Sequence, residues 1–173
     1  MTNLPIKGEK MEDKELSGEE KLNKLVHENE SSILVAQNEL SIRESSRKLM
    51  RLRDVEKSIN EINNFLSKRT WMDFTYKKID EESISLIGCI DLTDIKPEIE
   101  ITFSYPQVIA SPFFWTMDNN QMFIKLSSIE ELKEVTGLYA YDDVYVFKLS
   151  DEQLEGKSAI FITATGVQCN ILK

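Results

Sequence analysis

The residue types that most often carry catalysis are few and widely separated in this chain of 173 residues. His27 is the single histidine, and Cys89 and Cys169 are the two cysteines. A structural zinc site needs about four ligands, and a nucleophilic triad needs a histidine within hydrogen-bond reach of the nucleophile. The spacing therefore predicts neither a zinc site nor a triad. We expect both thiols to be reduced and buried, because each lies in an apolar, strand-like segment.

Carboxylates offer a second kind of chemistry, since clustered oxygens bind hard cations and positioned carboxylates act as acids and bases. Three short acidic groups qualify, namely DLTD (91–94), DNN (118–120) and YDD (141–143). The DNN group begins like a calcium loop but lacks its glycine and its distal glutamate. We interpret all three as solvated turns and predict no cofactor and no metal. The alternative is a small enzyme or ligand-binding domain that uses such a carboxylate cluster.

The stretch SPFFWTMDNNQMF, residues 111–123, places aromatic side chains on both sides of a turn. Asp-Asn-Asn tolerates the positive φ angles of tight turns, so the pattern predicts a β-hairpin. One face, with Phe113, Trp115 and Met117, is predicted to be core. The opposite face either lies under a helix or anchors a protein partner. With neighbouring turn residues, the predicted partner-binding surface comprises Phe114, Phe123, Asp118, Asn119, Tyr141, Asp142 and Asp143.

A helical segment over residues 19–69 must accompany these strands, because neither proline nor glycine occurs from Glu19 to Ile87. Apolar residues recur there at steps of three and four. A first seam, with a polar step at Asn29, consists of Leu22, Val26, Ile33, Ala36 and Leu40. A second seam, which we assign to oligomerisation, consists of Leu52, Val55, Ile59, Ile62 and Leu66.

The segment between the two seams, residues 41–48, has no apolar periodicity. One long helix can continue through it, or the chain can break there into a helical hairpin with Ser46 as the second N-cap. A short β-hairpin around Gln37 and Asn38 is a third alternative. In the helical forms the seams must pack against another helix, which is either the other half of the segment or a second subunit.

A basic stripe is predicted on this helix, because Arg43, Arg47 and Arg51 recur every four residues. The stripe is interpreted as a solvated face. Two functional alternatives are contact with nucleic acid and docking onto an acidic domain, in which exposed ion pairs orient more than they stabilise.

After Thr70 the apolar period changes to two, which predicts strands. The clearest alternation covers residues 97–105, and a short capped helix is predicted at residues 127–137. We therefore predict an α+β fold with a mainly antiparallel sheet. Its expected parts are a disordered tail (1–18), a helical arm (19–69) and an acidic sheet domain (70–173).

The distribution of charge along the chain limits the kinds of partner that we expect. Residues 71–173 contain 17 Asp and Glu against 8 Lys and Arg, which accounts for the whole net charge of −9. Such a domain repels phosphate backbones, so we expect a basic protein partner rather than nucleic acid. No stretch approaches the roughly 20 apolar residues of a membrane span, and the N-terminus lacks the apolar run of a signal peptide. We therefore expect a cytoplasmic protein.

These observations predict a non-enzymatic, intracellular protein-binding module. Concrete forms are a small acidic inhibitor, an immunity-type protein or a chaperone acting on a basic partner, with self-association through the helical arm. The alternatives are the carboxylate-based enzyme or ligand binder described above and a structural component that assembles through its arm.

Overall fold

A computed structural model describes residues 17–90, 96–117, 121–141, 143–151 and 160–172. The fold is α+β, as predicted: one long helix, α1 (Gly18–Leu66), precedes antiparallel sheets and a short helix, α2 (Ile129–Thr136). The chain divides into two compact units, residues 1–47 and residues 48–173.

Helix α1 is continuous through the polar segment at 41–48, so the predicted helical hairpin and β-hairpin alternatives are both wrong. Ser46 is not an N-cap. Its hydroxyl donates to the carbonyl of Ile42 at 2.8 Å, one turn earlier in the same helix. A serine can bond to the preceding turn in this way without interrupting a helix. The presence of Ser46 therefore did not mark the start of a second helix.

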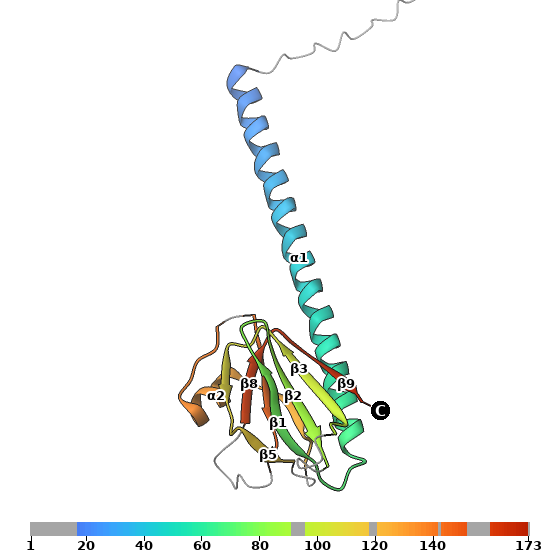
Figure 1. Cartoon of the computed structure of the whole chain (residues 1–173). Coiled ribbons are helices and arrows are strands. Elements are labelled where there is room, and N and C mark those ends of the chain that lie inside the picture. Colours follow the sequence, from blue (N-terminus) through green and yellow to red (C-terminus); the bar gives the residue numbers. More distant parts are fainter. Residues whose placement is uncertain (1–16, 91–95, 118–120, 142, 152–159, 173) are drawn as a thin grey trace, which may run out of the picture. The chain divides into compact units, whose positions relative to one another are not determined.

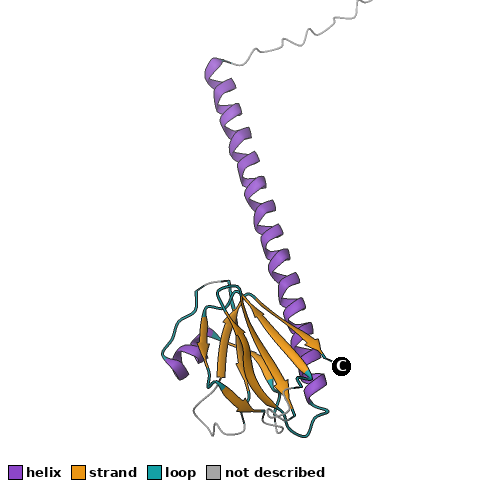
Figure 2. Ribbon diagram, viewed as in Figure 1, coloured by secondary structure: helices purple, strands orange, loops and turns teal. Residues whose placement is uncertain are grey.

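Two antiparallel sheets form the second unit (Figures 1 and 2). The five-stranded sheet has the order β5-β1-β2-β3-β9, and the four-stranded sheet has the order β4-β8-β7-β6. The strands are β1 (Asp73–Ile79), β2 (Ser83–Cys89), β3 (Ile99–Ser104), β4 (Val108–Ala110), β5 (Phe114–Thr116), β6 (Ile124–Ser127), β7 (Tyr145–Leu149), β8 (Ile160–Ala164) and β9 (Gly166–Ile171).

One hydrophobic core joins the two sheets. Strand β3 shows how it is built, because Ile99, Ile101 and Phe103 are fully buried while the residues between them are half-buried. This alternation is the one predicted from the sequence. Gly88 of β2 is needed where the core is tightest, since an added Cβ would lie 2.6 Å from the sulfur of Met72 and 2.8 Å from Ile99.

The C-terminal part of α1 belongs to this core. Val55, Ile59, Ile62 and Leu66 are buried together with side chains from both sheets, and Leu52 is half-buried. The predicted oligomerisation seam is therefore wrong for these four residues, because a surface that the chain's own sheets already cover is not available to a second subunit. The compact unit also begins at Lys48 rather than at the expected boundary of residue 70.

Helix α2 follows its sequence signals. The Ser128 hydroxyl accepts from the backbone N–H of Glu131 at 3.1 Å, and Gly137 ends the helix in the left-handed conformation with φ 73°. Leu132 is buried in a second cluster with Val146 and Phe161. The adjacent β7 residue Phe147 lies in the main core, so the four-stranded sheet has apolar side chains on both faces.

The predicted hairpin at residues 111–123 does not form. Strand β5 pairs with β1, whereas β6 pairs with β7 in the other sheet. Trp115 and Met117 are buried as expected. Phe113 is 82% exposed, contrary to the prediction, because it follows Pro112 and precedes the first paired residue of β5. The segments on either side of the turn both carry core aromatics, and placing them in different sheets that share one core buries both.

Candidate protein-binding surfaces

A set of large apolar side chains is exposed on α1 within the first unit. Each is between 49% and 66% exposed, and the set comprises Leu22, Leu25, Val26, Ile33, Leu34, Val35, Leu40 and Ile42. Single exposed apolar residues are ordinary on protein surfaces. A helical segment with this many in about six turns is unusual, because a helix of this kind normally covers its apolar side chains with a partner.

Five residues of the first unit share one helix face, and we call them the apolar stripe. At about 100° per residue, steps of three and four keep neighbouring side chains on one side of a helix. The apolar stripe consists of Leu22, Val26, Ile33, Ala36 and Leu40, all of them exposed. It coincides with the first seam predicted from the sequence, including the polar step at Asn29.

Charged residues flank the apolar stripe at both ends. Arg43 and Arg47 continue the same 3-4 spacing after Leu40, and Glu19 precedes Leu22 by three residues. All three side chains are exposed. The guanidinium of Arg43 lies 3.9 Å from the carboxylate of Glu39, with both side chains more than half exposed. Such a solvated pair is weak, so Arg43 is available to a stronger acceptor.

Phe123, one of the two aromatic residues predicted to anchor a partner, is not on the surface. Phe123 is only 2% exposed, and its ring stacks on Phe74 with a centroid distance of 4.3 Å. Phe74 also stacks on Trp115 at 5.9 Å. Alternation along an expected hairpin suggested an outward Phe123, but the residue belongs to a core formed by facing sheets. The prediction that Phe123 binds a partner is therefore wrong.

The other predicted partner-binding residues are dispersed. Phe114 begins β5, where it pairs with Thr75 of β1. Tyr141 is 81% exposed, and its backbone N–H donates to the side chain of Gln107 at 3.0 Å. Asp143 is exposed with φ 70°. The remaining predicted residues, Asp118, Asn119 and Asp142, lie outside the described residues.

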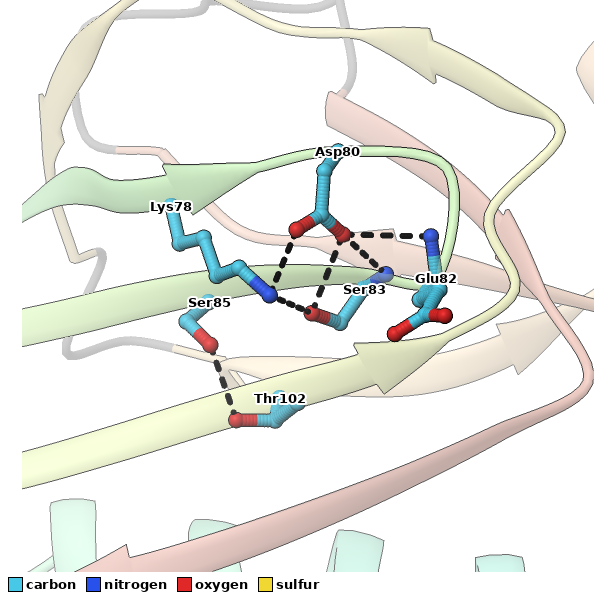
Figure 3. Close-up of polar contacts among 6 residues, drawn as sticks. All are labelled: Lys78, Asp80, Glu82, Ser83, Ser85 and Thr102. Atoms are coloured by element: carbon cyan, nitrogen blue, oxygen red, sulfur yellow. Dashed lines mark hydrogen bonds and ion pairs between the residues drawn. The ribbon is translucent and has the colours of Figure 1, made fainter.

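Several carboxylates of the second unit are paired with lysine or arginine within that unit. Figure 3 shows the β1–β2 turn, where Asp80 accepts from the backbone N–H groups of Glu82 and Ser83 at 3.1 and 2.8 Å and pairs with Lys78. The Lys78 ammonium and these N–H groups lower the pKa of Asp80 below its usual value. Two further ion pairs join Arg69 to Glu98 and Lys77 to Glu100. These carboxylates are already paired within the unit, which reduces the unpaired acidic surface left for a partner.

No metal-binding cluster forms within the described parts of the chain, where three or more His, Cys, Asp or Glu side chains nowhere gather closely enough. His27 is exposed, with Nδ1 3.8 Å from the Glu30 carboxylate. Both cysteines are free, Cys89 buried and Cys169 half-buried. Burial raises the pKa of both thiols, which opposes the thiolate that a reactive cysteine requires.

A pocket of about 480 Å³ lies within the second unit, beside the end of α1. Its lining combines the apolar side chains of Leu66, Met117, Met122 and Phe123 with side-chain amides from Asn60, Asn63, Asn64 and Gln121. This group of amides was not predicted from the sequence, although three closely spaced asparagines near the helix end were a usable signal.

Neither a protein-family model, nor a curated protein, nor a solved structure matches this chain. Throughout the described ranges, no helix combines the length and the apolar character needed to cross a membrane.

Proposed function

We propose that this chain is a non-enzymatic protein-binding module and that the apolar stripe of α1 is its main contact surface. The observation that supports the proposal is the exposure of Leu22, Ile33 and Leu40, each 58% or more, on one helix face. Burying a large aliphatic side chain in an interface stabilises it by about 1.5–3 kcal/mol, so a row of them is enough for specific binding. The second unit, which has its own core, is a folded body that follows the apolar stripe in the chain.

The proposed client of the second unit is a basic protein, since residues 71–173 carry 17 acidic against 8 basic residues. Small acidic inhibitors, immunity-type proteins and chaperones share this charge relationship with their targets. We place the chain in the cytoplasm, where free thiols such as Cys89 and Cys169 stay reduced. Assembly through the helix alone, without a client, is the structural alternative.

A matched pair of substitutions tests the contact surface. Ile33→Asp puts a charge into the apolar stripe, whereas Ile42→Asp puts the same charge on an equally exposed isoleucine that lies on the other side of the helix. Immobilised full-length chain should retain protein partners or further copies of itself from native cytosol in the wild-type and Ile42→Asp forms. It should lose them in the Ile33→Asp form. Equal retention by all three forms would rule out the apolar stripe as the contact surface.

A second candidate function is the binding of a small polar molecule in the amide-lined pocket. The exposed side-chain amides of Asn60 and Asn64 supply both donors and acceptors, which suits an uncharged ligand rich in hydroxyl groups. This differs from the carboxylate cluster predicted from the sequence. Titrating a set of monosaccharides while following the side-chain amide signals of Asn60 and Asn64 by NMR would test it. Unmoved signals at millimolar concentrations would contradict it.

A further inference from the structure

We propose that the partner of the apolar stripe is a second copy of the same helix, running in the opposite direction. This inference rests on the proposed function, because it names the protein that the apolar stripe binds. Its basis is that the helix face from Glu19 to Arg43 is complementary to itself when one copy is reversed. All of these residues lie in the first unit, so the inference depends on no contact with the sheets.

The register follows from the spacing of the apolar stripe. In an antiparallel pair centred on position 31, the numbers of two facing residues add up to 62. Leu22 then faces Leu40 of the second copy, and Val26 faces Ala36 of the second copy. The two-fold symmetry of such a pair repeats every contact. The layers formed by these two pairs are therefore apolar throughout, with leucine against leucine and valine against alanine.

The charges at the ends decide the direction. In the antiparallel register Glu19 faces Arg43 of the second copy, so opposite charges close the interface at both ends. In a parallel, in-register pair, Arg43 and Arg47 would each face their own copy across the seam. Like charges at successive seam positions disfavour that arrangement. Arg43 pairs with the solvated carboxylate of Glu39 at 3.9 Å. This contact is weak, so pairing with Glu19 of the second copy displaces no strong contact.

The polar step of the apolar stripe, Asn29, lies near the centre of this register. Asn29 faces Ile33 of the second copy, and the reverse contact follows by symmetry. An amide that faces isoleucine has no hydrogen-bond partner across the seam, so it reduces the affinity of the pair. The proposed pair is therefore a dimer of moderate affinity rather than a tight one.

Sedimentation equilibrium of the full-length chain tests the charge pairing. Glu19→Arg and Arg43→Glu, made singly, should each raise the dimer dissociation constant about 5- to 10-fold, since two exposed opposite-charge pairs become like-charge pairs. The double variant restores both pairs with the charges exchanged, and its dissociation constant should return to within about 3-fold of the wild type. Ile33→Asp should abolish the dimer, and Ile42→Asp should leave it intact. Circular dichroism checks that helix content is unchanged in each variant.

Cysteine cross-linking tests the direction. Leu22→Cys and Leu40→Cys chains, mixed and oxidised, should form a heterodimeric disulfide, while neither variant alone should cross-link beyond the wild-type control that carries Cys89 and Cys169. Cross-linking of each variant with itself would overturn the antiparallel register in favour of a parallel one. A chain that stays monomeric in sedimentation but retains another protein through the apolar stripe would overturn this inference and leave the proposed function standing. A chain that does neither would overturn both.

Discussion

The side-chain amide of Asn63 forms two hydrogen bonds with the backbone of Ile124, 61 positions later in the chain. Its Nδ2 donates to the Ile124 carbonyl at 2.8 Å, and its Oδ1 accepts from the Ile124 N–H at 3.1 Å. Ile124 begins β6, the edge strand of the four-stranded sheet, whose other side pairs with β7. The amide therefore imitates a neighbouring strand and satisfies backbone groups that would otherwise be left unpaired at a partly buried edge.

Replacing Asn63 should destabilise the second unit more than its exposure suggests. We expect Asn63→Ala to cost about 1–3 kcal/mol in the free energy of unfolding, since it leaves a donor and an acceptor of β6 without partners. Asn64→Ala removes the same side chain from the exposed neighbouring position and should cost less than about 0.5 kcal/mol. Urea denaturation of the full-length chain measures both. Equal costs for the two variants would mean that the Asn63 bonds contribute nothing net.

The two aromatic neighbours of residue 114 should respond oppositely to truncation. Trp115→Ala should cost about 3–5 kcal/mol, because Trp115 is 2% exposed and its ring contacts Phe74 and Tyr76 in the core. Phe113→Ala should change stability by less than about 0.5 kcal/mol, since that ring is 82% exposed. Thermal denaturation followed by circular dichroism separates the outcomes. A large loss from Phe113→Ala would show that the side chain is covered.

The boundary between the units predicts which fragment folds. Residues 48–173 should unfold cooperatively as an isolated fragment, because they contain the whole core that joins the two sheets. Residues 71–173 should not fold, since removing Ile62 and Leu66 along with the rest of the helix opens that core to water. Dispersed amide signals in a proton–nitrogen NMR spectrum of the longer fragment, and collapsed signals in the shorter one, are the expected result. A well-dispersed spectrum of the shorter fragment would contradict the assignment of the helix end to the core.

Acid should weaken the attachment of α2 to the sheet. The Lys148 ammonium, with its Nζ 2.6 Å from Glu131, and the hydroxyl of Ser127 lower the pKa of the Glu131 carboxyl below its usual value of 4.5. A carboxyl whose pKa is lower in the folded state stabilises the fold above its unfolded pKa, and this contribution disappears as the pH falls through the folded pKa. The stability advantage of the wild type over Glu131→Gln should therefore be present at pH 7 and shrink progressively below about pH 4.5.

The exposed Glu134 on the same helix provides the control for this titration. Glu134→Gln removes one carboxylate from α2 without touching Lys148, so its stability difference from the wild type should be small across the same pH range. Chemical denaturation at pH 7, 5, 4 and 3 measures both variants. A difference between the wild type and Glu131→Gln that does not depend on pH would contradict the role of the Lys148 ion pair.

Local sequence signals determined the elements of this protein. The 3-4 spacing from Leu22 onward predicted the helix, the alternation of Ile99, Ile101 and Phe103 predicted a half-buried strand, and the Ser128 cap with Gly137 bounded the short helix. These signals are readable because propensity, capping and amphipathic period act over a few residues. The α+β class followed from the order of the elements alone.

Tertiary packing decided which of two similar helical seams was buried inside the chain. Leu22 and Leu40 recur at the same steps as Ile59 and Ile62, yet only the second pair is covered by the sheets. Periodicity reports that a face is apolar, but it does not report what covers that face. Strand pairing was equally non-local: Phe123 left the predicted hairpin because its burial depends on Phe74, a residue almost 50 positions earlier. The amide of Asn63 found its acceptor and donor at Ile124 for the same physical reason, since hydrogen bonds between distant segments form only after the core has brought those segments together.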